Sequence, residues 1–338
     1  MIWLTLRQFR TPALAGGVLL AVALAYLLHL GTDIRDAYDA YRGRCDAGGD
    51  CAAAMRQFHG DYTNLLLYLA GASGLVPVLV GVFWGAPLVA RELETGTHRL
   101  VWNQSVGRRR WLTVKVLVVA TAAMAVAGLL SLALTWAAGP VDRVGADRFE
   151  LVPFGARNLA PVGYAAFAVV LGAVVGMLLR RTLAAMAVTL LAVVLVQFAV
   201  PNLVRPHYLP GEHLRMPMTA EAINAARGLG SITGAAVVKG VTVDGAWVTD
   251  ASVLRTADGE PLSRAEFDRC FTDPAPAGAT GTFGDTAACL GALDLHLDVE
   301  YQPTDRYWTF QWLELALYLG AGALLLLCGW WVVRRRVG

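Results

Sequence analysis

Six long apolar runs constrain the fold of this chain more than any other feature. Each has between 18 and 27 residues, and about 20 apolar residues in an α-helix suffice to cross the hydrocarbon core of a membrane. The runs are Ala13–Leu30, Leu65–Trp84, Leu112–Ala138, Pro161–Leu179, Leu183–Val200 and Gln311–Val333. With 56% hydrophobic and only 16% charged residues, the composition also lies outside the soluble range. We therefore predict an all-α, polytopic membrane protein with six transmembrane helices.

Charged side chains do not occur near the middle of any run. Lys115 and Glu314 lie close to an end of their runs, from where we expect them to reach the lipid headgroups. Transporters that are coupled to protons or sodium normally need ionisable groups at mid-membrane, so ion coupling within this chain is not predicted. The formal net charge of +2 likewise argues against a nucleic-acid partner.

The distribution of arginine predicts the orientation. If the N-terminus is cytoplasmic, the inner connections hold 12 arginines in 47 residues, whereas the short outer connections 31–64 and 138–159 hold 7 in 56. Because cytoplasmic loops are enriched in arginine and lysine, both termini are predicted to be cytoplasmic. The connection 202–310 is too long for this rule and falls outside the cell by alternation.

The cysteines agree with this topology. Cys45 and Cys51 share the first outer connection, and Cys270 and Cys289 share the long outer segment. Both predicted disulfides therefore lie on the oxidising side, where such bonds persist. The remaining Cys328 lies within the last run and is interpreted as a small apolar residue, and no His/Cys cluster has the spacing of a metal site.

The ends of the chain flank the membrane part. Residues 1–12 are too short to span and place Trp3 and Phe9 among two arginines, which predicts an N-terminal interfacial helix. A frayed start of the first span is the alternative. Transmembrane helices one to five then occupy residues 13–201, and residues 311–338 form the sixth helix and a cytoplasmic tail.

The segment 202–310 is predicted to form a small α+β extracellular subdomain between helices five and six. Strict alternation of apolar and polar residues over Leu293–Tyr301 indicates a strand. Two β-prone stretches, Ala236–Val243 and Ala246–Val253, predict a hairpin. Ser263 stands three residues before a glutamate, as in the capping box of a short helix.

Glycine and proline are frequent in the second span, which holds Gly71, Gly74, Pro77 and Gly81 within its apolar run and Gly85 directly after it. Two interpretations are open. The helix bends easily and moves during a functional cycle, or its glycines merely allow close packing against neighbouring helices.

The connection 85–111 between the second and third runs has too few apolar residues in sequence to insert and too many for an idle loop. Gly96 can end a helix that continues the second span, and Thr97 can cap the next one. Leu100, Val101 and Gln104 then share one face of that second short helix. We expect a soluble partner to dock on this segment.

A motif of closely spaced residues begins in the same connection and extends into the third run. Its residues are Arg91, Glu92, Glu94, Gly96 and Thr97, followed by Gln104, Ser105, Val106, Arg109, Trp111 and Lys115. This pattern resembles the membrane (permease) subunits of type 2 ATP-binding-cassette (ABC) exporters, especially the branch common in high-GC Gram-positive bacteria. Further resemblance lies in the segments 3–10, 161–186 and 306–312, whereas residues 202–290 match no family pattern.

The resemblance implies that about Thr97–Ser105 form a coupling helix in a groove of a separate ABC ATPase subunit. The residues that it assigns to ATPase coupling are Glu92, Glu94, Gly96, Thr97, Leu100, Val101, Trp102, Gln104 and Arg109. The chain itself has no phosphate-binding loop, so it is not predicted to be an enzyme or to bind a cofactor. ATP and Mg²⁺ are expected on the partner ATPase. A second permease copy or a paralogue is also expected, among the membrane lipids of a bacterial plasma membrane.

The predicted function is export of an amphiphilic or hydrophobic compound, such as a drug, an antibiotic or a lipid. Spans two and five are uncharged, and a translocation path along them would have Asn64, Thr189 and Gln197 as its polar groups. The alternative is a non-transporting ABC-type membrane sensor or mechanotransmission scaffold, which a folded outer subdomain would also suit. An intramembrane hydrolase is not predicted, because no nucleophile motif accompanies the serines of the spans.

Overall fold

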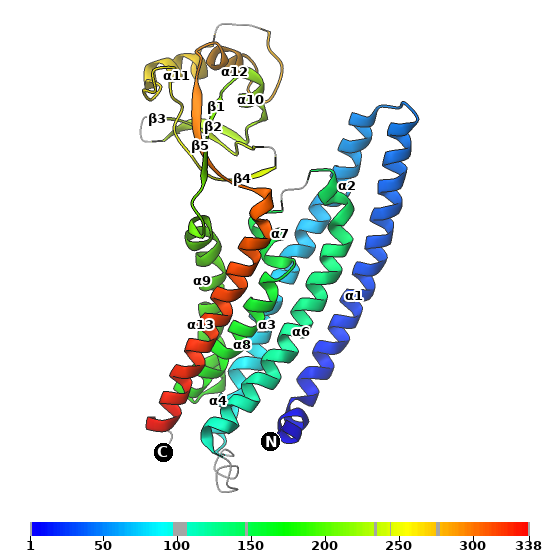
Figure 1. Ribbon diagram of the computed structural model, residues 1–338, viewed down its shortest axis with the longest axis vertical. Helices are drawn as coiled ribbons and strands as arrows, with labels where there is room; N and C mark the ends of the chain where they lie inside the picture. The colour runs from blue at the N-terminus through cyan, green and yellow to red at the C-terminus, as the bar shows by residue number, and fades with distance from the viewer. Residues whose placement is uncertain are drawn as a thin grey trace. The chain divides into compact units, whose positions relative to one another are not determined.

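A computed structural model describes residues 2–96, 107–145, 148–232, 235–243, 245–274 and 278–336 of the chain. The chain divides into two compact units. The membrane unit comprises Met1–Arg205 and Trp308–Gly338, and the insert unit comprises Pro206–Tyr307. Figure 1 shows the long helices of the first and the small sheet and short helices of the second.

Six helical segments of the described chain are long and apolar enough to cross a membrane, which confirms the predicted number. They are Phe9–Asp46, Cys51–Glu94, Arg109–Arg143, Ala160–Leu179, Thr182–His207 and Thr304–Val332. The helical elements of these segments, together with the short α7 that precedes the fourth, are α1 (Ile2–Asp46), α2 (Cys51–Gly74), α3 (Val76–Val80), η1 (Gly81–Gly85), α4 (Ala86–Glu94), α6 (Arg108–Arg143), α7 (Leu151–Ala156), α8 (Ala160–Leu179), α9 (Thr182–Ala199), η2 (Val200–Val204), η3 (Arg205–His207) and α13 (Tyr307–Arg336). The chain is thus a mostly helical, multi-pass membrane protein.

The first helix is longer than its apolar run. α1 begins at Ile2, continues through Pro12 and extends to Asp46, so no break separates residues 2–12 from the first span. Their position at the membrane interface stays a prediction.

The connection 31–64, predicted to lie outside the cell, is helical except for the turn 47–50, so α1 and α2 extend well beyond the first and second apolar runs. Asp50 caps α2 by accepting a hydrogen bond of 2.9 Å from the nitrogen of Ala53. Aromatic rings hold the two helices together: the ring centroids of Tyr38 and Phe58, and those of Tyr41 and Phe58, are 5.9 Å apart. Because charged and polar residues surround these aromatic residues in the sequence, hydropathy alone did not indicate that the two helices continue here.

The second span is interrupted. α2 ends at Gly74, a short α3 follows, and Gly81–Gly85 form a π-helical turn (η1) before α4 begins. Pro77 and Pro87 occupy the first turns of α3 and α4, where the missing N–H of proline costs little. π-helical turns are rare and occur frequently at functional sites.

Helix α8 packs against this interrupted region at very close range and is itself buried along most of its length. A Cβ atom on Gly172 would lie 2.6 Å from the carbonyl oxygen of Gly81, and one on Gly85 would lie 2.7 Å from that of Val169. Glycine is therefore required at this helix crossing. The packing interpretation holds for these glycines, while at Gly74 a Cβ would meet no atom of the described chain within 4 Å.

The insert unit contains a three-stranded antiparallel sheet of order β1-β5-β4 and a separate pair, β2 and β3. Its elements are β1 (Glu212–Pro217), α10 (Ala220–Ala225), β2 (Gly228–Ile232), β3 (Ala235–Lys239), β4 (Ala246–Ala251), α11 (Arg264–Thr272), α12 (Gly284–Gly291), β5 (His296–Pro303) and η4 (Thr304–Arg306). Its buried apolar residues form one cluster that includes Ile223, Leu254, Phe267, Leu290 and Leu297.

Two local predictions in this unit have different outcomes. Ser263 caps α11, accepting a hydrogen bond from the nitrogen of Glu266 and donating one to its carboxylate, as the capping box predicted. The predicted hairpin of Ala236–Val243 with Ala246–Val253 is present only as a bridge between Val243 and Ala246, and its two strands do not pair with each other. β3 pairs with β2, and β4 pairs with the central strand β5, because β5 presents its alternating apolar residues to the unit's core.

Candidate ATPase-coupling site

The carboxyl end of α4 carries the acidic residues of the motif. α4 ends at Glu94, and Gly96 follows with a φ of +73°, a left-handed conformation that favours glycine. The next predicted coupling residues are Thr97, Leu100, Val101, Trp102 and Gln104, and all five lie outside the described residues. The described chain resumes at Gly107 and enters α6.

Glu92 connects α4 to α6 by forming an ion pair with Lys115. The side chain of Lys115 is 2% exposed and that of Glu92 is 12% exposed, so the pair is nearly enclosed. The Lys115 ammonium also lies 5.3 Å from the ring centroid of Trp111, within the range of a cation–π contact. The expectation that Lys115 reaches the headgroups is therefore wrong, because its charge is compensated inside the helix bundle.

Glu94 connects α4 to the start of α9. Its Oε2 accepts hydrogen bonds from the backbone nitrogen of Thr182 at 2.9 Å and from the Thr182 hydroxyl at 2.6 Å. The first N–H groups of a helix have no partner within the helix, so a carboxylate at this position acts as a cap. Here the cap comes from a different helix. It links α4 to α9 two residues before Gly96, the last described residue ahead of the gap in the connection 85–111.

Arg109 connects α6 to the last helix. Its guanidinium lies 5.8 Å from the ring centroid of Trp330, and the indole nitrogen of Trp330 donates a hydrogen bond of 3.0 Å to the hydroxyl of Thr113. The described motif residues thus reach three helices: Glu92 reaches α6, Glu94 reaches α9 and Arg109 reaches α13.

The three residues predicted for a translocation path are not brought together. Asn64 is exposed on α2, whereas Thr189 is fully buried on α9. Gln197 donates a hydrogen bond of 3.3 Å to the carbonyl oxygen of Gly74, at the break in span two. Gln197 therefore joins span five to span two, Thr189 is enclosed on span five, and a role of these residues in a translocation path stays a prediction.

A second buried polar centre, which the sequence reasoning missed, lies at the other end of α9. Arg205 and Glu314 are fully buried, and the Nε and Nη2 atoms of Arg205 donate to the Glu314 carboxylate at 2.7 and 2.8 Å. Tyr164 donates its hydroxyl proton to the same carboxylate, and the Arg205 guanidinium lies 4.0 Å from the ring centroid of Phe154. The expectation that Glu314 reaches the headgroups is therefore wrong, because the carboxylate is enclosed and Arg205 compensates its charge.

Gln311 completes the link between α13 and the start of α8. Its Oε1 accepts hydrogen bonds from the backbone nitrogens of Leu159 at 3.0 Å and Ala160 at 2.9 Å. One signal could have indicated this centre: Glu314 is the only acid in the last apolar run, and a carboxylate there needs a cation nearby.

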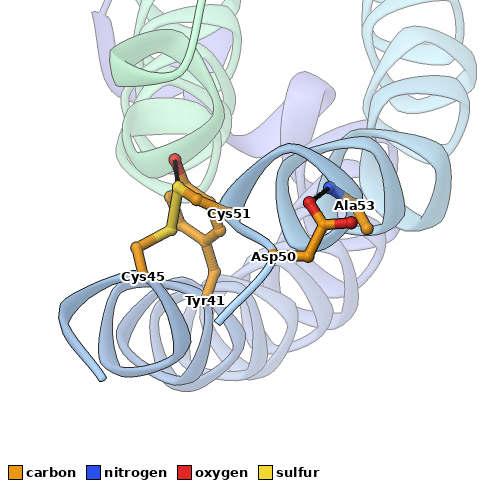
Figure 2. The surroundings of a disulfide bond; sticks show 5 residues. All are labelled: Tyr41, Cys45, Asp50, Cys51 and Ala53. Atoms are coloured by element: carbon orange, nitrogen blue, oxygen red, sulfur yellow. Dashed lines mark hydrogen bonds between the residues drawn. A yellow bond between two sulfur atoms is a disulfide. The ribbon is translucent and has the colours of Figure 1, made fainter. Parts of the chain in front are cut away.

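Both predicted disulfides are present. Cys45–Cys51 closes the turn between α1 and α2, as Figure 2 shows beside the Asp50 cap. Cys270–Cys289 joins α11 to α12 in the insert unit. Each bond thus links two neighbouring helices within one unit.

Six helices long and apolar enough to cross a membrane define a multi-pass membrane protein, and the described motif residues connect four of these helices. The chain belongs to the family described as "ABC-2 membrane transporter related", whose model matches residues 17–205. The match covers more than half of the chain and ends at Arg205, the last residue before the insert unit. No curated protein and no solved structure matches the chain. Membership makes the chain an ABC-2 type permease, a non-enzymatic membrane subunit whose family implies an ATPase partner.

Proposed function

We propose that this chain is the permease subunit of an ABC exporter of the high-GC Gram-positive branch. It moves an amphiphilic or hydrophobic compound out of the cell, and a separate subunit hydrolyses the ATP. Both termini and the connection 85–111 lie in the cytoplasm, and the insert unit lies outside the cell. A second permease copy or a paralogue completes the transporter.

The observation that carries this proposal is the pair of carboxylates at the end of α4. Glu92 binds Lys115 of α6, and Glu94 caps α9 at Thr182. Any displacement of the chain that follows Gly96 therefore acts on spans two, three and five together. This is the arrangement that a permease needs if an ATPase docked on Thr97–Ser105 is to change the shape of the membrane unit.

The interruption of span two fits the same role. A helix that ends in a docking segment must transmit movement. The π-helical turn at Gly81–Gly85 separates α4, which would act as the lever, from the rest of the span. Close packing of Gly85 against α8 gives the lever a fixed support. Movement of α4 is then directed along α8 and is not absorbed by a loose contact.

The cap at Glu94 gives the sharpest test. The chain is co-expressed with its ABC ATPase subunit, identified by co-purification, and reconstituted in lipid nanodiscs, where ATP hydrolysis and transport are measured. We expect Glu94→Ala to leave the complex assembled but to reduce transport-coupled hydrolysis at least about tenfold, the equivalent of 1.4 kcal/mol in coupling. Thr182→Val removes one of the two hydrogen bonds, and the double variant should be no worse than Glu94→Ala because both changes break the same link.

Asp50→Ala is the matched control. It also removes a carboxylate that caps a helix, α2, at a cost in stability of about 1 kcal/mol, but this cap lies in the α1–α2 turn. Coupled hydrolysis should stay at the wild-type level in this variant. Equal losses in Asp50→Ala and Glu94→Ala would mean that only general stability was affected, and the coupling role of Glu94 would be rejected.

The docking segment is tested separately. Proline insertion within Leu100–Gln104, or replacement of Leu100 or Val101 by a charged residue, should release the ATPase from the purified complex. If the complex and its activity survive, the assignment of the coupling helix is wrong. If the ATPase stays coupled but no compound moves, the scaffold alternative replaces export; the compact insert unit, with its own core and disulfide, is the feature that favours that alternative.

A further inference from the structure

One exposed face of the first turns of α1, here called the stripe, carries two arginines between two apolar side chains. Trp3, Arg7, Arg10 and Leu14 follow one another at intervals of three or four residues, and all four are exposed. On the opposite side, Phe9 is buried against Trp84, with ring centroids 4.9 Å apart. The stripe is therefore turned away from the helix bundle by the packing of the helix itself.

A hollow of about 520 Å³ lies over this stripe and is lined by Trp3, Arg7, Arg10, Ala13 and Leu14. The Arg7 guanidinium lies 5.4 Å from the ring centroid of Trp3, within the range of a cation–π contact. Within the described ranges, neither Arg7 nor Arg10 forms an ion pair with a carboxylate. The first acidic residue of the chain is Asp33, about 34 Å further along the same helix.

The stripe continues as an apolar surface along α1. Leu14, Val18 and Val22 are 59%, 63% and 65% exposed, again at four-residue intervals. Over these positions the helix rises by about 12 Å, which is the scale of an acyl chain's upper half. Two cations followed by a strip of apolar side chains match one molecule with an anionic head and a hydrocarbon tail.

We propose that α1 holds a binding site for an anionic phospholipid. The headgroup phosphate lies between the guanidinium groups of Arg7 and Arg10, whose planar donors suit phosphate oxygens. Trp3 marks the level of the headgroups, and an acyl chain follows Leu14 and Val18. This site depends on the chain's being a membrane protein and on neither the direction of transport nor the ATPase.

The test uses the full chain purified in detergent and native mass spectrometry with two probes, phosphatidylglycerol and phosphatidylcholine of identical acyl chains. Wild-type protein should retain phosphatidylglycerol at least about tenfold more than phosphatidylcholine, as two arginines beside an anionic lipid imply. Arg7→Gln/Arg10→Gln should abolish this preference. Arg7→Lys/Arg10→Lys keeps the charge, and most of the preference should remain; this variant keeps the test valid if the glutamine variant does not fold.

The matched control is Arg42→Gln/Arg56→Gln, which removes two exposed arginines from the α1–α2 hairpin. The net charge falls by the same amount, and the lipid preference should be unchanged. An equal loss in both double variants would reduce the effect to net charge and overturn the site. Displacement of the bound lipid by soluble glycerol phosphate would also overturn it, since that anion lacks the acyl chains that the apolar strip requires.

Discussion

Two triads of tyrosine, glutamate and arginine occur in this chain, one in each unit, and they differ in burial. In the insert unit, Glu212 accepts hydrogen bonds from the Tyr301 hydroxyl at 3.1 Å and from Nη2 of Arg306 at 2.8 Å. The Arg306 and Glu212 side chains are 29% and 46% exposed. Water can therefore replace either partner at little cost, and an exposed pair of this kind typically contributes about 0.2–1 kcal/mol.

In the membrane unit the same three residue types are enclosed. Glu314 and Arg205 are both 0% exposed, and the carboxylate accepts two hydrogen bonds from the guanidinium and one from Tyr164. Water cannot replace a partner that is lost here. The difference shows that the surroundings decide what such a triad does: the exposed one adds a polar contact, whereas the buried one fixes the relative positions of three helical segments.

The buried triad also has a particular place in the chain. Arg205 is the last residue of the membrane unit before the insert unit, and Glu314 belongs to α13, which returns from it. Tyr164 belongs to α8, the most buried span. The triad therefore holds together the two points at which the chain leaves and re-enters the membrane unit, whatever the insert unit does.

The largest expected effect follows from removing the buried carboxylate's charge. Glu314→Gln leaves Arg205 as an uncompensated cation, and breaking a buried pair in this way costs about 3–5 kcal/mol. The same substitution in the exposed triad, Glu212→Gln, should cost well under 1 kcal/mol. Thermal unfolding of the two variants in one detergent measures the contrast, and equal shifts in melting temperature would contradict it.

A double variant distinguishes two causes of lost stability, the missing attraction between the two side chains and the buried charge that is left without a partner. Arg205→Met/Glu314→Leu removes both charged groups and should be more stable than Glu314→Gln alone, because apolar residues can replace a buried pair at little cost. If the double variant were the less stable of the two, the attraction itself would carry most of the free energy.

A smaller effect is expected when the charge is kept and the forked geometry is lost. Arg205→Lys retains a cation but cannot donate two parallel hydrogen bonds to Glu314 or lie flat against Phe154. We expect a loss of about 1–3 kcal/mol, the cost of a charged hydrogen bond left unmade. Arg306 also donates hydrogen bonds of 2.9 Å to the carbonyl oxygen of Pro210 and to Oε1 of Gln302. Arg306→Lys should therefore lose less stability than Arg205→Lys, and an equal loss would show that the exposed triad is tighter than its burial indicates.

The sequence predicted the features that depend on local composition. Hydrophobic length was enough for all six spans, because a lipid environment permits few alternatives to a helix of about 20 apolar residues. The predicted topology gave each pair, Cys45 with Cys51 and Cys270 with Cys289, a shared connection, which was enough for both disulfides. Proximity in the sequence or in the topology made these features visible.

The features that depend on distant partners were missed. Glu92 and Glu94 were selected by resemblance, but their partners Lys115 and Thr182 follow from the packing of α4 against α6 and α9. Glu314 meets Arg205 across 109 residues of sequence, most of which form the insert unit. One sequence does not say which distant residue pairs with an acid, so Glu314 was assigned to the membrane surface and Glu92 and Glu94 to ATPase coupling.

The smallest expected effect is a titration in the exposed triad. The hydrogen bond to the Glu212 carboxylate, together with partial burial and the negative charge of Glu212, raises the pKa of Tyr301 above its ordinary value, although Arg306 opposes the shift. A raised pKa means that the folded state binds the proton more tightly than the unfolded state does. The contribution to stability is therefore present below the ordinary tyrosine pKa and is lost as the pH rises through the folded one.

Glu212→Gln should return the pKa of Tyr301 towards its ordinary value, because it removes the charge that favours the protonated phenol. The measurement is an alkaline titration of phenolate absorbance in the full chain, with Tyr301→Phe subtracted to isolate this residue. Glu221→Gln removes another exposed carboxylate of the insert unit and should leave the titration unchanged. If Glu212→Gln also left it unchanged, the Tyr301–Glu212 hydrogen bond would not persist in solution, and the likeness between the two triads would end at their residue types.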